Sequence, residues 1–262
     1  MSSKKLLHPL KVVVLGTGTS LGVPMIACQC DVCKSSDNKD KRLRSSVLIE
    51  YCNINIVIDC GPDFRMQMLN ANIGHIDAIV MTHSHKDHTG GLDDVRAFNW
   101  INRSAVNVYA EKNVIDSLNS QYPYVFGNSK YPGLPQVNLH KIDCSPFKIK
   151  GLDITPLRAM HHKLPVLGFR IGSFSYLTDV SFIPEETLNK MEGTSVLIID
   201  ALRKTSHISH FSLDEALDIV HQVNPDKAYF THISHHMGLH KKINNELPQN
   251  AKLAYDGQVI IL

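Results

Sequence analysis

The chain has 262 residues, of which 43% are hydrophobic and 20% are charged, the balance of an ordinary globular protein. A net charge of +2 excludes a strong general field for nucleic acid or a membrane surface, and no window approaches the roughly 20 apolar residues of a membrane span. The N-terminal segment carries Lys4, Lys5 and Lys11 but no apolar core of signal-peptide length, so we expect a cytoplasmic protein.

The first half of the chain predicts five strands, two helices and two long loops. Short apolar and β-branched runs predict strands at 11–16, 46–50, 54–59, 77–81 and 106–110. Helices are expected near 63–70 and 111–120. The charged segment 34–44 is predicted to be an exposed loop. The aromatic segment 122–135 has no clear period and is interpreted either as a cover for a site or as a surface excursion packed by its own aromatics.

The second half predicts more strands, alternating with helices near the C-terminus. Strands are expected at 137–142, 147–149, 152–157, 168–171, 175–178, 195–199 and 227–231, and helices at 184–191, 212–223 and 239–247. Ser212 and Glu215 form a capping-box pattern. Residues 252–255 and 258–262 are predicted to pair as a hairpin turned by Asp256-Gly257. Because no composition break interrupts the chain, we predict one domain over 1–262: an α/β sandwich with two sheets inside and helices outside.

One stretch, 82–91, is unusually rich in metal-binding side chains. His83, His85, Asp87 and His88 lie within six positions, directly after the predicted buried strand 77–81. Imidazole and carboxylate groups are good ligands for a divalent metal at neutral pH. A loop at the end of a rigid strand is also a common place for functional residues. The stretch therefore predicts a metal centre.

Three further candidates occupy equivalent places later in the chain. His161, Asp179 and His232 each end or follow a predicted apolar strand. A sheet whose strands end at one edge would bring all of these side chains to one rim.

With these motifs the chain resembles the metallo-β-lactamase superfamily over nearly its whole length. The resemblance implies an αββα sandwich, with two mixed β-sheets flanked by helices, and a two-metal site at one edge. It implies that one metal is held by His83, His85 and His161, that the second is held by Asp87, His88 and His232, that Asp179 bridges the two, and that Asp59 orients the ligands. His162 is the alternative to His161. The resemblance favours His161, because the similar family pattern places its ligand ahead of a Lys-Leu pair, here Lys163-Leu164.

Such a site predicts hydrolysis. Two metals roughly 3.5–4 Å apart can share a water, lower its pKa to about 7 and present hydroxide to an electrophile. Asp87 thereby becomes a catalytic residue as well as a ligand. The electrophile can be a phosphodiester, a thioester, a lactone or a β-lactam. Histidine and aspartate bind zinc or manganese, so the sequence is compatible with either metal at the catalytic site.

A cysteine cluster lies apart from the histidine stretch. Cys28, Cys30 and Cys33 offer three thiolates, and a structural zinc needs a fourth ligand, for which His235 is the candidate and His236 the fallback. The alternative is three reduced cysteines without metal. The remaining cysteines, Cys52, Cys60 and Cys144, are predicted to be buried free thiols.

This combination resembles one branch of the superfamily, the PhnP-type phosphodiesterase of the carbon–phosphorus lyase pathway, which acts on a five-membered cyclic phosphate of phosphoribose. The branch shares the three-cysteine start, the histidine core and a histidine three positions beyond the last metal ligand. It implies that His210 is the general acid for the leaving oxygen, with His207 as a competitor. The pyrroloquinoline quinone biosynthesis B protein is similar in the cysteine region, but it lacks the full histidine set.

The first hypothesis is therefore a metal-dependent phosphodiesterase that acts on a small or cyclic phosphodiester, with two catalytic metal ions and one structural zinc. A lactonase or thioesterase on the same scaffold is the second. A tRNA-processing nuclease would need a flexible arm rich in Lys, Gly and Pro, which the sequence lacks, so nucleic acid is not expected as a partner. A non-catalytic metal-binding protein is disfavoured by the intact ligand set. Dimers are common in the resembling group, which leaves a homodimer open.

Overall fold

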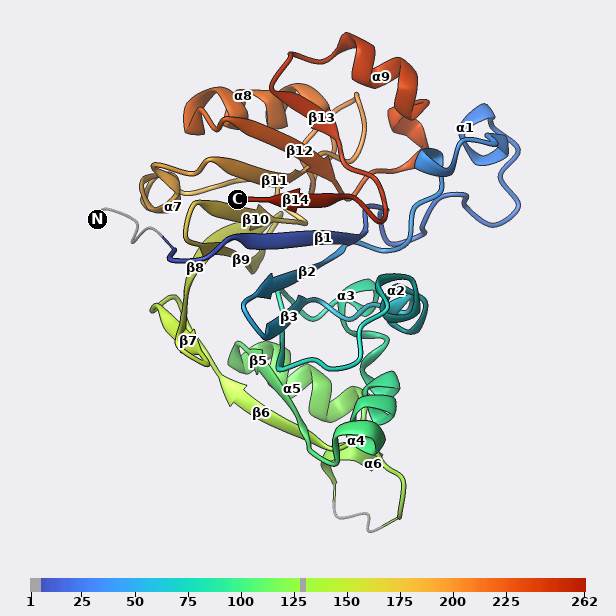
Figure 1. Cartoon of the computed structure of the whole chain (residues 1–262). Coiled ribbons are helices and arrows are strands. Elements are labelled where there is room, and N and C mark those ends of the chain that lie inside the picture. The colour runs from blue at the N-terminus through green and yellow to red at the C-terminus, as the bar shows by residue number, and fades with distance from the viewer. Residues whose placement is uncertain (1–5, 128–130) are drawn as a thin grey trace.

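Two seven-stranded β-sheets form the centre of the molecule in the computed structural model, which describes residues 6–127 and 131–262 (Figure 1). The first sheet has the strand order β14-β1-β2-β3-β4-β5-β6, and the second has the order β13-β12-β11-β10-β9-β8-β7. Helices cover the outer faces of both sheets. The predicted αββα sandwich is confirmed.

The strands of the first sheet are β1 (Leu10–Gly16), β2 (Ser46–Tyr51), β3 (Ile54–Ile58), β4 (Ala78–Val80), β5 (Val106–Ala110), β6 (Val137–Lys141) and β14 (Val259–Ile261). Those of the second sheet are β7 (Phe147–Ile149), β8 (Leu152–His161), β9 (Leu164–Ile171), β10 (Phe174–Leu177), β11 (Val196–Asp200), β12 (Lys227–Thr231) and β13 (Ala251–Leu253).

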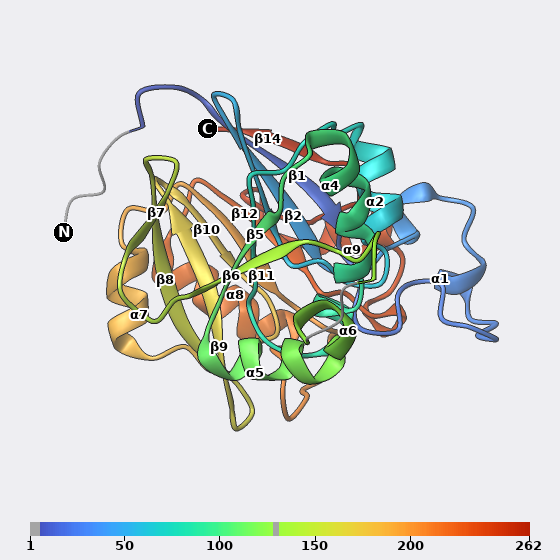
Figure 2. The same ribbon diagram turned by 90° about the horizontal axis from the view of Figure 1, so that it is seen from below.

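The α-helices in the described residues are α1 (Asp31–Lys34), α2 (Phe64–Ala71), α3 (Lys86–Thr89), α4 (Arg96–Asn102), α5 (Lys112–Gln121), α6 (Pro123–Phe126), α7 (Glu185–Met191), α8 (Leu213–Val223) and α9 (His240–Glu246). Short 3-10 helices lie at Asn38–Asp40, Leu92–Val95 and His235–Met237. In both ribbon views the segment around α1 projects from the body of the molecule (Figures 1 and 2).

Alternation along the strands builds three apolar layers. On β1, Val12 and Val14 face the layer between the sheets, whereas Val13 points to the layer under α2 and α5. On β11, Ile198 joins the layer between the sheets and Ile199 joins the layer under α8. Both faces of the central strands are therefore buried, which explains why these strands appear in the sequence as continuous apolar runs.

Strand direction decides where the functional residues meet. Strands β3 to β6 are parallel, and so are β10 to β13. Parallel neighbours end at the same edge of a sheet, where ligands commonly bind in open α/β sheets. The carboxyl ends of β3, β4, β10, β11 and β12 therefore supply residues to one rim.

The predicted C-terminal hairpin is wrong. β13 pairs with β12 in the second sheet, whereas β14 pairs with β1 in the first, so the chain crosses between the sheets at residues 254–258. The carboxylate of Asp256 at this crossing accepts hydrogen bonds from Thr17 Oγ1 and Leu43 N, at 2.7 and 2.6 Å. The Asp-Gly pair resembles a hairpin turn, but each flanking strand pairs with a strand of a different sheet.

The prediction of an exposed loop at 34–44 is also wrong in part. Asp40 and Arg42 are buried, and Arg42 Nη1 donates to Thr17 Oγ1 and to the carbonyl of Ala254, both at 2.8 Å. Sequence reasoning missed this network because charged residues are rarely buried unless they are paired. One partner of Arg42, Ala254, lies more than 200 residues further along the chain, so no local pattern shows the pairing.

Several smaller expectations also need correction. Helices α1, α3 and α4 were not predicted, and β8 and β9 are longer than expected. The predicted loop 122–135 contains a short helix, α6. Residues 128–130 of this segment lie outside the described residues. That the segment covers a site therefore stays a prediction. Of the three scattered cysteines, Cys60 is buried as predicted, but Cys52 is exposed and Cys144 only partly buried. No helix among the described residues is long and apolar enough to cross a membrane.

Candidate metal centre

Three residues of the candidate site share an unusual backbone conformation directly after a strand. Asp59 follows β3, Asp179 follows the end of β10, and His232 follows β12, with φ values of +64°, +56° and +57°. Residues other than glycine rarely adopt this left-handed region, and such positions gather at functional sites. Each strand thus ends in a turn that presents its side chain at the shared rim.

The histidine stretch is fixed to the end of β3. Cys60 N donates to the carbonyl of His88 at 2.9 Å, and Gly91 N donates to the carbonyl of Cys60 at 2.8 Å. Between them, a Cβ on Gly61 would overlap the carbonyl oxygen of Asp87. The turn that carries Asp87 and His88 therefore packs directly on the backbone of Gly61, and this close approach requires glycine at position 61.

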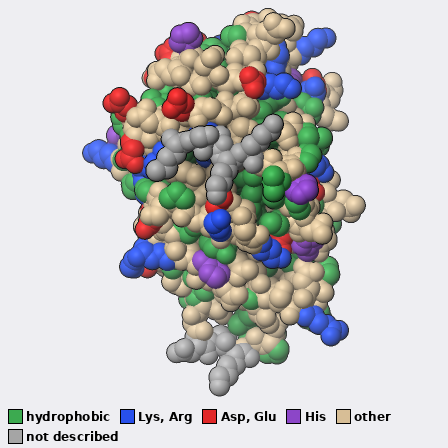
Figure 3. Space-filling model, turned by 60° about the vertical axis from the view of Figure 1, so that its left-hand side comes forward, with side chains coloured by type: hydrophobic (Ala, Val, Ile, Leu, Met, Phe, Trp, Pro, Cys, Tyr) green, Lys and Arg blue, Asp and Glu red, His purple; other side chains and the backbone are tan. Residues whose placement is uncertain are grey.

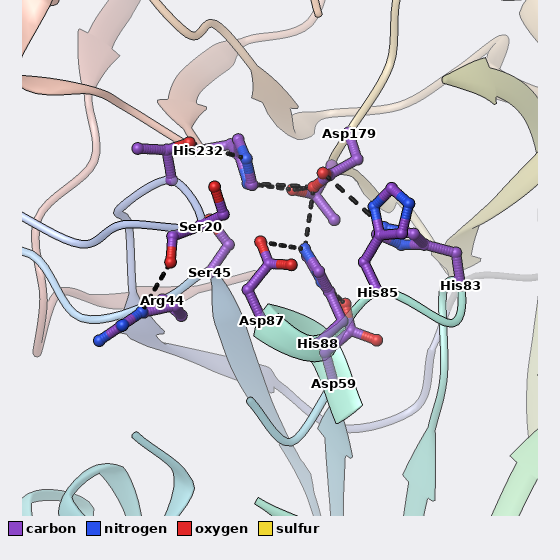
Figure 4. Close-up of polar contacts among 12 residues, drawn as sticks. Ser20, Arg44, Ser45, Asp59, His83, His85, Asp87, His88, Asp179 and His232 are labelled. Carbon is purple, nitrogen blue, oxygen red and sulfur yellow. Dashed lines mark hydrogen bonds and ion pairs between the residues drawn. The ribbon is translucent and has the colours of Figure 1, made fainter. Parts of the chain in front are cut away.

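One ligand group consists of Asp87, His88, Asp179 and His232, whose donor atoms all lie within 4.8 Å of one another. Asp179 Oδ1 is 3.1 Å from His88 Nε2 and 3.0 Å from His232 Nδ1. Asp87 Oδ2 is 3.3 Å from His88 Nε2. The close-up shows these side chains pointing toward one another around Asp179 (Figure 4). The structure thus brings together the residues expected to hold the second metal.

A second group consists of His83, His85 and Asp179. The other carboxylate oxygen of Asp179, Oδ2, lies 3.8 Å from His83 Nε2, so the two oxygens of one aspartate face the two groups. His161 lies next to this group, with its ring centroid 5.2 Å from that of His85. One nitrogen of His161 also lies within 4.8 Å of donor atoms of Asp179 and His210. His162 is exposed and belongs to none of the described groups, which favours His161.

The donor atoms fit divalent cations. His83 Nε2 and His88 Nε2 are buried and make no hydrogen bond in the structure. On its opposite nitrogen, His88 Nδ1 lies 2.7 Å from Asp59 Oδ2, and this carboxylate is itself held by Thr82 N and Thr82 Oγ1, both at 2.8 Å. An imidazole that donates Nδ1–H to a carboxylate presents the lone pair of Nε2, which is how metal-binding histidines are usually oriented. Asp59 thus occupies the orienting position expected from the sequence.

Electrostatics favours a cation at the same place. Burial opposes protonation of His88, but the carboxylates of Asp179, Asp59 and Asp87 outweigh it and raise the pKa of His88 well above its ordinary value. Burial opposes ionisation of Asp179, but His232 and His88 hold the pKa of this carboxyl well below its usual range. Several buried carboxylates therefore make a strongly negative site that a divalent cation would neutralise.

His210 stands beside this site and is held by a buried aspartate. Its ring lies 4.5 Å from that of His161 and 4.8 Å from that of His232, measured between centroids. His210 Nδ1 is 3.1 Å from Asp200 Oδ2, which also accepts from Val180 N at 2.9 Å. The ring of His207 is tilted against that of His210, with the centroids 5.3 Å apart. Sequence reasoning did not assign Asp200 a role, although it ends an apolar strand close to the positions that Asp59 and Asp179 occupy after theirs.

The cysteine cluster forms a separate group with the predicted histidine. The donor atoms of Cys28, Cys30, Cys33 and His235 lie within 4.8 Å of one another, and His235 Nδ1 is 3.4 Å from Cys28 Sγ and 3.3 Å from Cys30 Sγ. Tetrahedral zinc with Zn–S bonds of about 2.3 Å would accept four donors at such separations. His236 is exposed and lies outside the group.

Comparison with known proteins agrees with this architecture. The family described as "Beta-lactamase superfamily domain" matches residues 54–233. A protein named "Octanoyltransferase" from Porphyromonas gingivalis is 41% identical over 256 residues, which are 97% of this chain and 52% of that protein. The chain spans about half, or less, of the length of the first curated relatives it matches.

Solved structures cover the chain more fully. A structure described as a new diphosphatase from the PhnP family is 38% identical, with a TM-score of 0.92 and coverage of 98% of both chains. Zinc-bound PqqB from Methylobacterium extorquens has a TM-score of 0.78, covering 96% of this chain and 100% of its own, but at 16% identity it supports the fold alone. From the matched family, the fold and the rim of histidines and aspartates, the chain belongs to the metallo-β-lactamase superfamily, and its sequence and fold place it in the PhnP-type branch.

Proposed function

We propose that the protein is a metal-dependent phosphodiesterase that cleaves a small or cyclic phosphodiester, with two divalent metal ions at the rim and His210 as the general acid. The observation that carries the proposal is the position of the His210–Asp200 pair, against the rings of His161 and His232. The similarity to the PhnP-family diphosphatase supports phosphorus chemistry at this site.

The ligands divide between two ions. His83, His85, His161 and Asp179 would hold one, and Asp87, His88, His232 and Asp179 the other. Divalent ions bound here would lower the pKa of a water to make a nucleophile and would neutralise charge on the phosphoryl oxygens. Zinc or manganese satisfies this donor set. Cys28, Cys30, Cys33 and His235 would hold a separate structural zinc.

His210 supplies what the metals lack. An alkoxide leaving group needs a proton, and Nε2 of His210 is the nitrogen left over once Nδ1 faces Asp200. Burial opposes protonation of this ring, but Asp200 outweighs it and raises the pKa of His210 above its ordinary value. Asp200 thereby favours the protonated form of the ring, and it also fixes the direction of the ring.

A nuclease function finds less support. The net charge of +2 gives no strong general field for nucleic acid, and on the one face shown in Figure 3 the Lys and Arg side chains are scattered among Asp and Glu. A nucleic-acid surface would gather them into a stripe that follows a phosphate backbone. We therefore propose a small-molecule substrate.

A thioesterase is the second candidate. The 41%-identical relative is named an octanoyltransferase, and acyl transfer from a thioester would use the same polarising metal site. Because this chain covers 52% of that protein, the name describes a longer molecule.

A hydrolysis panel separates these candidates. The purified protein, loaded with zinc or manganese, is assayed on bis(4-nitrophenyl) phosphate, cyclic nucleotides, cyclic ribose phosphates, a lactone and an octanoyl thioester. We expect turnover of the phosphodiesters, and its loss in Asp179→Ala. Thioester or lactone turnover without phosphodiester turnover would overturn the proposal.

A further inference from the structure

The two ring nitrogens of His232 have different partners. Nδ1 lies 3.0 Å from Asp179 Oδ1, inside the ligand group. Nε2 lies 3.2 Å from Thr19 Oγ1, which is its one hydrogen-bond partner among the described residues. Both His232 and Thr19 are buried. The histidine is therefore held between an aspartate of the rim and a hydroxyl that comes from the loop after β1, a contact that the proposed function does not use.

The backbone around Thr19 is fixed to the segment that carries His232. Ile233 N donates to the carbonyl of Thr17 at 2.8 Å, and Thr19 N donates to the carbonyl of Ile233 at 3.1 Å. Between these two bonds, Gly18 and Ile233 form an isolated parallel bridge. The hydroxyl therefore reaches His232 from a backbone that is bonded on both sides to the next residue, so that the fold itself sets its position.

Two other candidate ligand histidines are also held by an acceptor on one ring nitrogen. Nδ1 of His88 lies 2.7 Å from the carboxylate of Asp59, and Nδ1 of His161 lies 2.7 Å from a backbone carbonyl oxygen. An acceptor at one nitrogen takes its proton and leaves the lone pair of the other nitrogen for a metal. If Nδ1 of His232 is the ligand atom, Nε2 carries the proton, and the hydroxyl of Thr19 can accept it.

We propose that Thr19 is a positioning residue for one of the two metal ions: its hydroxyl accepts the Nε2–H of His232 and keeps the lone pair of Nδ1 directed at that ion. This inference rests on the two-metal site of the proposed function and adds a residue that is neither a ligand nor the general acid. His232 belongs to the ligand group of Asp87 and His88 and is absent from that of His83 and His85, so the effect should be confined to one ion.

Manganese titration of matched variants tests this role. The rim is stripped with a chelator while zinc analysis confirms that the cysteine cluster stays loaded, and Mn²⁺ is then titrated, because imidazole and carboxylate groups bind it whereas thiolates select zinc. We expect the wild type to bind two Mn²⁺ ions. Thr19→Val replaces the hydroxyl by a methyl group of similar size, so one ion should bind about 10–100-fold more weakly while the affinity for the other stays unchanged.

A conservative variant and a control separate the hydroxyl from packing. Thr19→Ser keeps the hydroxyl and should bind both ions nearly as the wild type does. Thr205→Val makes the same replacement at an exposed threonine and should change neither affinity. If Thr19→Val binds both ions as tightly as the wild type, the role of Thr19 is overturned and the two-metal site stands. If Thr19→Ser is as weak as Thr19→Val, the role is also overturned, because lost packing would then explain the change.

A measurement on the wild type needs no variant to fold. In the zinc-loaded protein, ¹⁵N NMR of the histidine rings should show the proton of His232 on Nε2 and the metal on Nδ1. The reverse arrangement would overturn the inference, because Thr19 could not then accept a proton from Nε2. If the wild type binds neither manganese nor zinc at the rim, the proposed metal-dependent function fails, and the role of Thr19 fails with it.

Discussion

Asp200 holds His210 through a 3.1 Å contact between Oδ2 and Nδ1, at the edge of a rim made of metal-binding side chains. The carboxylate has no exposed surface, and its Oδ1 atom makes no hydrogen bond in the structure. A buried carboxylate that is only partly satisfied keeps a strong attraction for a protonated ring. The proposed role of His210 as a general acid depends on this pair.

Replacing His210 by alanine should slow hydrolysis most for substrates with poor leaving groups. Such substrates need a proton on the departing oxygen, whereas nitrophenolate leaves without one, so the expected loss is about 10²–10⁴-fold for an alkyl ester and much smaller for a nitrophenyl ester. Metal content should stay unchanged. Steady-state rates on the two ester classes and metal analysis give the answer, and equal losses on both would contradict the acid role.

Replacing Asp200 by asparagine should move the alkaline limb of the pH–rate profile to lower pH. Asp200 raises the pKa of His210, and the acid is active only when protonated, so activity falls as pH rises through that pKa. Without the carboxylate charge the pKa drops and the fall begins earlier. Asp218→Asn on the exposed side of α8 is the matched control. If the alkaline limb does not move in Asp200→Asn, a group other than His210 determines it.

Replacing Asp179 by alanine should remove metal from both catalytic positions. Its two carboxylate oxygens face His88 and His83 respectively, so both ion sites lose a ligand, whereas Asp87→Ala affects one group only. Metal analysis should show a loss of about two ions for Asp179→Ala and about one for Asp87→Ala, with the cysteine-bound zinc retained in both. Equal losses in the two variants would speak against a bridging aspartate.

The zinc-stripped cysteine cluster should be alkylated in a defined order. A hydrogen bond with His235 lowers the pKa of Cys30 to about 6, whereas burial raises the pKa of Cys33 to about 11. Because the thiolate reacts, Cys30 should be modified by iodoacetamide at pH 7 well before Cys33, with a rate that rises through about pH 6. Peptide mass spectrometry measures the order. Zinc-loaded protein should be protected at all three cysteines, and simultaneous modification would rule out the His235 contact.

Removing the helix cap next to His210 should destabilise the fold modestly. Ser212 Oγ accepts from Glu215 N at 3.3 Å, and Glu215 Oε2 accepts from Ser212 N at 2.7 Å, which is the capping box predicted from the sequence. Ser212→Ala should lower the free energy of unfolding by about 1 kcal/mol in urea titrations. Ser120→Ala, at an exposed position of α5, is the control and should change it little.

Local patterns predicted most of the secondary structure. The strands at Val106–Ala110, Phe147–Ile149 and Lys227–Thr231 have the predicted bounds, because apolar, aromatic and β-branched residues recur over a short run in each. Short helices such as α3 were missed because four residues carry no periodic pattern. The terminal strands were misassigned because a turn dipeptide shows that the chain bends, whereas the partner of each strand depends on pairing across the whole chain.

The sequence alone determined the kinds of metal-binding side chain and their places after apolar strands, because hydrophobic runs and ligand types can be recognised locally. Tertiary structure decided which of them meet: it set the two oxygens of Asp179 toward different histidines, placed Asp200 on His210, and buried Arg42 against the crossing segment 254–258 near the far end of the chain. These relationships arise where two sheets stack and parallel strands end at one rim. Such geometry depends on contacts between residues far apart in sequence, which no local pattern encodes.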